Sequence, residues 1–194
     1  MRWLDNTRRV SSAILLSILL SSYSMYELDC DRKLLAESEK IALTQIGVLE
    51  SGNNRGEVGK YLHSVGLTEG NPYCAAGVYW CFDEARMKLG YGLESIPVER
   101  TAVANAMYND ARRRGKLVFR NVKRHDLLVW KSKQSWKGHI ERVISVSKNS
   151  VVRTIGFNVK TENGEGVAVK TRFIKHPLGR LMLRGVITFN EVEL

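Results

Sequence analysis

The sequence predicts a single α+β domain in which helices come first and an antiparallel β-sheet follows. Apolar residues recur at helical spacing in the first half of the chain, whereas β-branched residues dominate the strand-like segments of the second half. Helices and strands that are segregated in this way are typical of α+β proteins. The 194 residues, of which 44% are hydrophobic, suffice for one core and are too few for two comfortable domains.

The N-terminal residues have the pattern of a secretory signal peptide. Arginines precede the apolar run 13–20, and the small residues of Ser22-Tyr23-Ser24 suit a signal peptidase. The apolar run is too short to cross a bilayer as a helix, so we expect no stable membrane span. The prediction is a signal peptide over residues 1–24, one folded domain over 25–194, and export to the periplasm or the extracellular space. An uncleaved amphipathic anchor is the alternative.

Four helices are expected after this segment. The third has Asn71 as its N-cap, Pro72 as its first residue and Gly90 as its stop signal. The fourth is expected to be capped by Thr101 and to end before Gly115. The predicted helices span residues 31–47, 57–65, 72–89 and 101–114.

Six segments rich in β-branched or apolar residues predict the strands. The third and fourth of them are joined by a hairpin. If its turn has an even number of residues and is centred between Lys148 and Asn149, Asn158 lies opposite His139 on the same face. A three-residue turn would break this pairing. The predicted strands span residues 117–119, 127–130, 140–146, 151–157, 167–169 and 184–189.

The charge of the chain restricts its partners. It carries 30 basic and 20 acidic residues, a formal net charge of +10. Such an excess suggests a polyanionic neighbour, which is nucleic acid, anionic lipid or an acidic wall polymer. The densest cluster is Arg112-Arg113-Arg114, and a solvated helix end is its simplest interpretation. The signal segment argues against nucleic acid and no recognition module accompanies the charge, so we expect no nucleic-acid partner.

Cys74 is the most informative residue, because it falls in the first turn of the third predicted helix. Unpaired N–H groups and the helix dipole favour a negative charge there, which makes a thiol nucleophilic. A buried structural cysteine is the alternative interpretation. If Cys74 is the working thiol, Cys30 and Cys81 remain without an assigned role. They could form a disulfide with each other, or Cys81 could pack in the core. No CxxC pair or Cys/His cluster has metal-site spacing, so we expect no metal and no cofactor.

His139 has the sequence setting of a general base for Cys74. It follows a glycine and precedes a β-branched strand, where an imidazole could take the thiol proton and return it to a leaving amine. A third polar group must hold the ring in its working tautomer, and the hairpin register favours Asn158. Glu141 shares the face of His139 and could orient the ring instead, although a solvated strand carboxylate is the simpler interpretation. The histidines that lack this setting are His63, His125 and His176.

Oxyanion donors are expected close to the sulfur. The backbone N–H of Cys74 is the natural candidate, and the side chain of Asn54 or Tyr73 could add a second donor. The sequence leaves that choice open. We expect the substrate to contact Asn54, Tyr73 and Trp136, the last of which lies just upstream of His139.

Five segments together resemble the landmarks of CHAP domains, the cysteine, histidine-dependent amidohydrolases/peptidases of the NlpC/P60 group. The most specific of them contains Cys74. The resemblance implies a papain-like α+β fold, with the nucleophile helix packed on an antiparallel sheet. It also implies hydrolysis of amide bonds in peptidoglycan, either between muramic acid and L-alanine or within the stem or cross-bridge peptides. The segments are Gly52-Asn53-Asn54-Arg55-Gly56, Asn71-Pro72-Tyr73-Cys74-Ala75-Ala76, Asp126-Leu127-Leu128-Val129-Trp130, Gly138-His139-Ile140 and Thr154-Ile155-Gly156-Phe157-Asn158.

The resemblance assigns Cys74 as nucleophile and His139 as base, and makes peptidoglycan the expected partner. An inhibitor or immunity protein is a further candidate partner. The family often has Glu-Gly-Asn after a Thr-Ile pair, whereas this chain has Gly156-Phe157-Asn158. The acidic orienting residue is therefore missing at Gly156 and the asparagine is kept at Asn158, which could serve as the third member. The alternative function is a catalytically silent protein of the same fold that binds cell-wall peptides.

Overall fold

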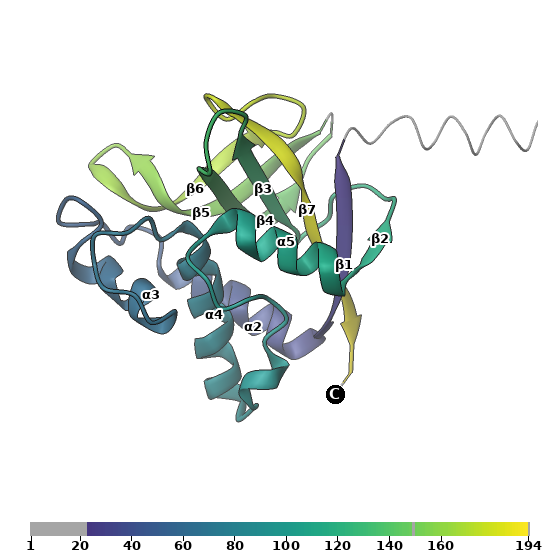
Figure 1. Ribbon diagram of the computed structural model, residues 1–194. Coiled ribbons are helices and arrows are strands. Elements are labelled where there is room, and N and C mark those ends of the chain that lie inside the picture. The colour runs from purple at the N-terminus through teal and green to yellow at the C-terminus, as the bar shows by residue number, and fades with distance from the viewer. Residues whose placement is uncertain (1–22, 149, 194) are drawn as a thin grey trace, which may run out of the picture.

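The computed structural model describes residues 23–148 and 150–193, so the expected signal peptide lies almost wholly outside the described residues. It confirms the α+β class, with four α-helices and one seven-stranded sheet among the described residues (Figure 1). The helices are α2 (Arg32–Thr44), α3 (Gly59–Ser64), α4 (Cys74–Leu89) and α5 (Ala104–Arg114), with short 3₁₀ turns at Gly56–Val58 and Leu93–Ser95. The strands are β1 (Ser24–Asp31), β2 (Lys116–Val118), β3 (Leu127–Ser132), β4 (Gly138–Val146), β5 (Val151–Thr161), β6 (Gly164–Phe173) and β7 (Leu181–Val192).

The sheet is antiparallel except at one place. Its strand order is β2-β1-β7-β3-β4-β5-β6, and β1 pairs with β7 in parallel. The prediction of a wholly antiparallel sheet is therefore wrong for this pair. Strand β1 was not predicted from the sequence. Its parallel partner β7 lies near the other end of the described residues, so the pairing leaves no local pattern.

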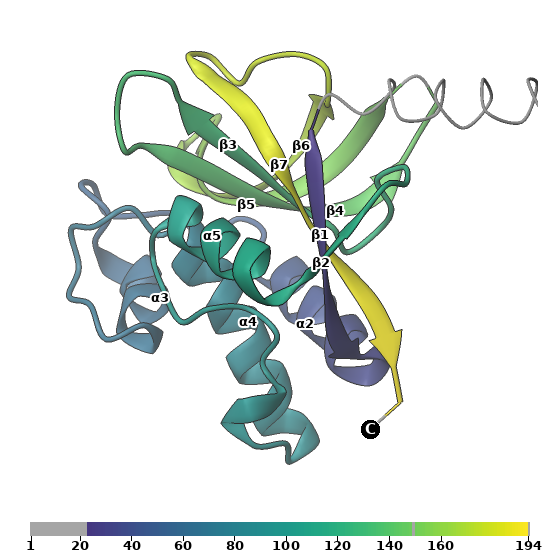
Figure 2. The same cartoon turned by 45° about the vertical axis from the view of Figure 1, so that its right-hand side comes forward.

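The helices cover one face of the curved sheet (Figures 1 and 2). Residues that alternate along β3 show the two faces. Leu127 and Val129 pack among α2, α4 and α5, whereas Leu128 and Trp130 belong to a separate cluster with residues of β4, β5 and β7. A third cluster joins α3 and α4 to the β5 residues Ile155 and Phe157. Helix α4 contributes to both helical clusters and is the central helix of the domain.

Cys74 lies in the first turn of α4, as predicted, but the helix begins at Cys74 instead of Pro72 and the predicted cap is wrong. The N-cap position is occupied by Tyr73 without a side-chain hydrogen bond, and Asn71 instead donates to the carbonyl of Thr68 at 3.2 Å. Gly90 ends the helix in the left-handed conformation (φ 73°), which confirms the stop signal. The helix α5 is also shorter than predicted, since Thr101 lies ahead of it and accepts a hydrogen bond from the Val103 N–H.

The hairpin β4–β5 keeps the predicted register on one side of an irregularity in the strand pairing and loses it on the other side. Glu141 lies opposite Gly156, but nearer the turn Val146 lies opposite Val152, which is one residue out of that register. An irregularity between Val143 and Ser145 absorbs the difference. The even-numbered turn was therefore wrong. The irregularity restores the expected register at Glu141 and Gly156, but the expected pair of His139 and Asn158 is not formed.

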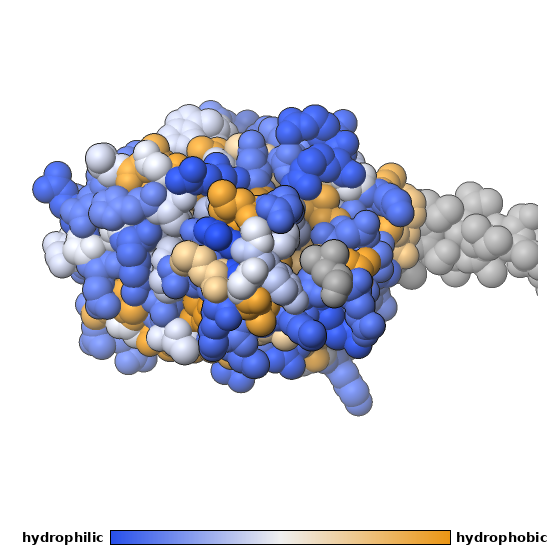
Figure 3. Space-filling view, turned by 90° about the horizontal axis from the view of Figure 1, so that it is seen from below, coloured by the Kyte–Doolittle hydropathy of each residue, from blue (hydrophilic) through white to orange (hydrophobic). Residues whose placement is uncertain are grey.

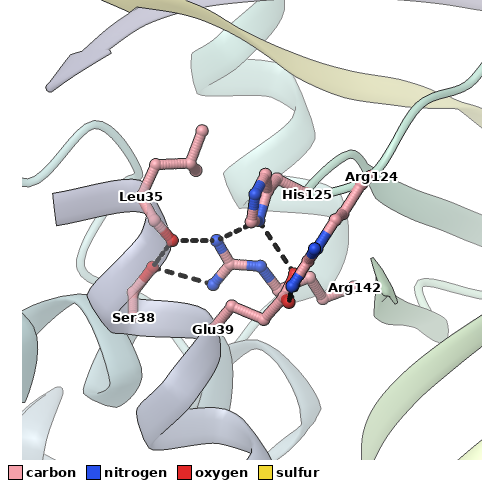
Figure 4. Close-up of polar contacts among 6 residues, drawn as sticks. All are labelled: Leu35, Ser38, Glu39, Arg124, His125 and Arg142. Atoms are coloured by element: carbon pink, nitrogen blue, oxygen red, sulfur yellow. Dashed lines mark hydrogen bonds and ion pairs between the residues drawn. The ribbon is translucent and has the colours of Figure 1, made fainter. Parts of the chain in front are cut away.

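Helix α2 is fixed to the sheet by a buried cluster of charges around Arg142 of β4 (Figure 4). The Arg142 guanidinium donates to the Ser38 hydroxyl at 2.8 Å and to the Leu35 carbonyl at 2.9 Å. Glu39, which is 2% exposed, pairs with Arg124 and lies 2.9 Å from the His125 ring. Burial alone would raise the pKa of Glu39, but His125 and Arg124 outweigh it and lower the pKa to about 2.

The face seen from below the helices is mostly hydrophilic, and its apolar side chains form small separate groups (Figure 3). Among the described residues, no helix combines the length and the apolar character needed to cross a membrane.

Candidate active site

Cys74 is the first residue of α4 and is 4% exposed. The first helical hydrogen bond of α4 runs from the Gly77 N–H to the Tyr73 carbonyl at 2.8 Å, which leaves the N–H of Cys74 outside the helical ladder. The thiol and the His139 ring interact, since Cys74 is one of the two groups that raise the pKa of His139. Helix and strand thus bring together two residues that are 65 positions apart in the sequence.

His139 is the second residue of β4 and is buried. Its Nε2 lies 3.0 Å from Oε1 of Glu141, so Nδ1 is the ring nitrogen left for the thiol. The ring also lies beside the indole of Trp130, with 6.1 Å between centroids. Burial alone would lower the pKa of His139, but Cys74 and Glu141 together outweigh it and raise the pKa to about 9. This setting favours an imidazolium at neutral pH.

Glu141 is the residue that orients His139 in the structure, and it is fully buried. Its Oε2 accepts from the Thr154 hydroxyl at 2.6 Å and from Nε of Arg172 at 2.8 Å, while a second nitrogen of Arg172 pairs with Oε1. Burial would raise the pKa of Glu141, but Arg172 and His139 outweigh it and lower the pKa to about 2. The interpretation of Glu141 as a solvated strand carboxylate is therefore wrong.

Asn158 does not contact His139. It adopts a left-handed backbone conformation (φ 59°) within an irregularity of β5 between Gly156 and Val159. Its side-chain N–H donates to Oδ1 of Asn54 at 2.9 Å. The bulge turns the asparagine away from the straight-strand position on which its expected contact depended. The third position beside the imidazole is taken by Glu141 instead.

Asn54 and Tyr73 lie around the start of α4. The Tyr73 ring is fully buried and stacks on Tyr61 at 5.8 Å between centroids. Its hydroxyl makes no hydrogen bond of good geometry, although Glu50 and Asn158 lie close to it, and burial raises its pKa. One carboxylate oxygen of Glu50 is likewise buried without a partner. These two buried polar atoms are candidates for binding a substrate group or a water.

Trp136 stands on the loop between β3 and β4 with 68% of its surface exposed. Its carbonyl accepts a hydrogen bond from the Asn105 side chain at 3.0 Å, which ties the loop to α5. A groove of about 770 Å³ lies between this loop and the one before β7. The basic residues that line it are Lys133, Lys137 and Arg180.

Cys30 and Cys81 are the other two cysteines of the chain. Cys30 and Cys81 are buried and free, so the disulfide considered between them is not formed. Burial raises the pKa of both thiols to about 12, which keeps them protonated. Among the described residues, no group of three or more His, Cys, Asp or Glu side chains is placed to hold a metal ion.

Comparison with known proteins gives one match. The family model described as the CHAP domain matches residues 66–158. This segment contains Cys74, His139, Glu141, Gly156 and Asn158. No curated protein and no solved structure matches the chain.

Proposed function

Because this chain is a CHAP-domain protein, we propose that it hydrolyses amide bonds of peptidoglycan with Cys74 as nucleophile and His139 as general acid and base. The bond is either the one between muramic acid and L-alanine or one within the stem or cross-bridge peptides. The observation that carries the proposal is the buried row of contacts from Cys74 through His139 to Glu141. A cysteine, a histidine and an orienting carboxylate are the parts that a thiol hydrolase requires.

The proposed reaction begins with the Cys74 thiolate and the His139 imidazolium. The sulfur attacks the scissile carbonyl carbon, and the oxygen that gains the negative charge is stabilised by the N–H of Cys74. His139 then protonates the leaving amine, which leaves a thioester on Cys74. The neutral imidazole next removes a proton from water, which hydrolyses the thioester and frees the carboxylate. Glu141 holds the ring in one orientation through both halves of the reaction.

Two surface features at the loop between β3 and β4 support an acidic substrate. Trp136 offers an exposed apolar surface next to the strand that carries His139. The groove with Lys133, Lys137 and Arg180 offers positive charge, and the whole chain has a formal net charge of +10. Peptidoglycan carries free carboxylates on its stem peptides, which such a groove would attract. Export by residues 1–24 would bring the protein to this substrate and remains part of the proposal.

Digestion of purified peptidoglycan tests the function. The wild type should release new amine ends, and Cys74→Ser and His139→Ala should each reduce the rate by at least about 10²-fold. Cys81→Ala is the matched control, because Cys81 is the second cysteine of α4 and is predicted to have no part in the reaction. Mass spectrometry of the products would name the bond. Unchanged release by Cys74→Ser would contradict the assignment, and binding without release by the wild type would favour the silent alternative.

A further inference from the structure

The carboxylate that orients His139 comes from β4, although the resemblance of the sequence to CHAP domains places an acid at position 156 of β5. The two positions are cross-strand neighbours, since Glu141 lies directly opposite Gly156. We propose that the orienting acid has been exchanged across this pair, and that Gly156, Thr154 and Arg172 are positioning residues that hold Glu141 in its place. The inference rests on the proposed roles of Cys74 and His139.

Because Gly156 has no side chain, the Glu141 carboxylate can occupy the space beside it. A Cβ atom at position 156 would lie 3.0 Å from Oε1 of Glu141, 3.1 Å from its Cδ and 2.8 Å from Cγ1 of Val159. These separations are shorter than ordinary contacts between carbon and its neighbours. The backbone of Gly156 does not require a glycine, because its φ is not among the positive values. The Glu141 carboxylate and Val159 therefore together leave no room for a side chain at this position.

Thr154 and Arg172 hold the Glu141 carboxylate in place by hydrogen bonds. Both oxygens of Glu141 are engaged, Oε2 by Thr154 at 2.6 Å and by Arg172 at 2.8 Å, and Oε1 by His139 at 3.0 Å and by Arg172. A carboxylate held at both oxygens cannot rotate away from the imidazole. A bidentate arginine pair is also the strongest geometry for such a contact.

The charges of these residues alternate along one row. Arg172 is positive, Glu141 is negative and His139 is positive, and Cys74 lies beyond His139. Each buried charge therefore has an opposite charge beside it, which offsets its loss of hydration. The Arg172 side chain is 19% exposed, whereas the Glu141 side chain between it and His139 is fully buried.

A reciprocal exchange tests the proposal. Glu141→Ala should lower kcat/KM by at least about tenfold, and Gly156→Glu alone should also lower it, because two carboxylates then compete for one space. The double variant E141A/G156E should recover at least about tenfold over Glu141→Ala, since the acid returns to the neighbouring strand. A folded double variant that is no more active than Glu141→Ala would overturn the exchange.

A smaller substitution keeps the proposal testable if the double variant does not fold. Gly156→Ala should lower kcat and leave KM unchanged, because it displaces the carboxylate and not the substrate. The variant G156A/V159A removes the contact with Val159, so it should stay impaired if the loss arises at Glu141. Recovery of full kcat in G156A/V159A, or an unimpaired Gly156→Ala, would overturn the role of Gly156.

The role of Arg172 is tested with its own set of variants and a matched control. Arg172→Met should lower kcat by about tenfold with KM unchanged, and Arg172→Lys should recover part of it because the positive charge returns. The control is Arg153→Met, which removes an exposed arginine of the neighbouring strand β5. An Arg172→Met variant with the kcat of the wild type would overturn its positioning role.

Alkylation of Cys74 by iodoacetamide separates this inference from the proposed substrate. At neutral pH, Glu141→Ala should slow alkylation by at least about tenfold and E141A/G156E should restore it, whether or not peptidoglycan is cleaved. If alkylation follows this pattern and peptidoglycan stays intact, the exchange stands and the substrate is wrong. If alkylation rates are the same in all variants, the exchange is wrong.

Discussion

The charge of Glu141 is stabilised by side chains instead of by water. Its carboxylate is fully buried and its partners are His139, Thr154 and Arg172. Breaking a buried pair by removing one partner costs about 3–5 kcal/mol, because the remaining charge is left without compensation. The residues of the site therefore contribute to the stability of the domain as well as to its chemistry.

The pKa values of the site predict how this stability depends on pH. His139 has a folded-state pKa raised to about 9, so its contribution is full below its ordinary value of about 6.5 and is lost as the pH rises through 9. Glu141 has its pKa lowered to about 2, so its contribution is present above about 4.5 and is lost as the pH falls through 2. We expect the two contributions to be complete together between about pH 4.5 and 6.5.

Urea unfolding of the wild type and His139→Ala between pH 6 and 9.5 measures the His139 contribution. The difference in free energy of unfolding between them should shrink over this range by an amount on the order of 3 kcal/mol. His63→Ala is the control, because His63 is exposed. A difference between wild type and His139→Ala that stays constant across the range would contradict the predicted linkage.

Local signals identified Cys74 and His139, but not the residues that support them. A helix start and a glycine before a strand are visible in a short window of sequence, and both residues lie where these signals place them. Glu141 was considered, but an acid that alternates with apolar residues on a strand has the pattern of a solvated face. Its burial depends on Arg172, which lies 31 positions away. The missing side chain at Gly156 was the one available signal, and it indicates an exchange only once the strand pairing is known.

At the scale of elements, Gly77 sets how closely α4 approaches β5. A Cβ atom at this position would lie well inside contact distance of the Phe157 ring. Alanine is favoured over glycine in helices by about 1 kcal/mol, so helix propensity and packing predict opposite signs for Gly77→Ala. We expect packing to dominate and the variant to lose about 1–3 kcal/mol of stability.

Thermal or urea unfolding of Gly77→Ala decides between these signs. Met87→Ala is the control on the same helix, because Met87 is 48% exposed and its replacement should change stability little. The double variant G77A/F157L should recover part of the loss, since the smaller side chain leaves room for the new methyl group. A Gly77→Ala variant that is more stable than the wild type would show that the helix and the strand can separate without cost.

The four helices and all six strands expected from the sequence are present to within a few residues, and the element that escaped prediction is β1. Its residues 24–31 lie between the segment predicted as a signal peptide and the first helix, where no alternation identifies a strand. It is held by pairing with β7, more than 150 positions away. The register of the hairpin β4–β5 also depends on more than local sequence. A bulge and a turn with an odd number of residues offset each other at Glu141 and Gly156. Neither feature has a local sequence signal.

For the molecule as a whole, the net charge of +10 predicts that binding to an acidic polymer depends on salt. Replacing Lys133, Lys137 and Arg180 by glutamine should weaken binding to isolated peptidoglycan by about tenfold at low salt, because exposed charges contribute about 0.5 kcal/mol each. The loss should fade as ionic strength rises, and the rate of Cys74 alkylation should stay unchanged.

A sedimentation assay with insoluble peptidoglycan at several salt concentrations measures this effect. The control is a triple glutamine variant with the same change in net charge at exposed cations that do not line the groove, namely Lys33, Arg112 and Lys160. Equal losses in both triple variants would show that total charge matters and the groove does not.

The position of β7 has a consequence for when the domain can form. This strand consists of residues 181–192, yet it lies inside the sheet between β1 and β3. While a ribosome is still making the preceding residues, β1 has no neighbour on that side and β3 has only β4. Such distant pairings also make folding slow. The seven-stranded sheet therefore cannot be completed until β7 has been made. Such a delay would suit an export channel for unfolded chains if residues 1–24 direct the protein there.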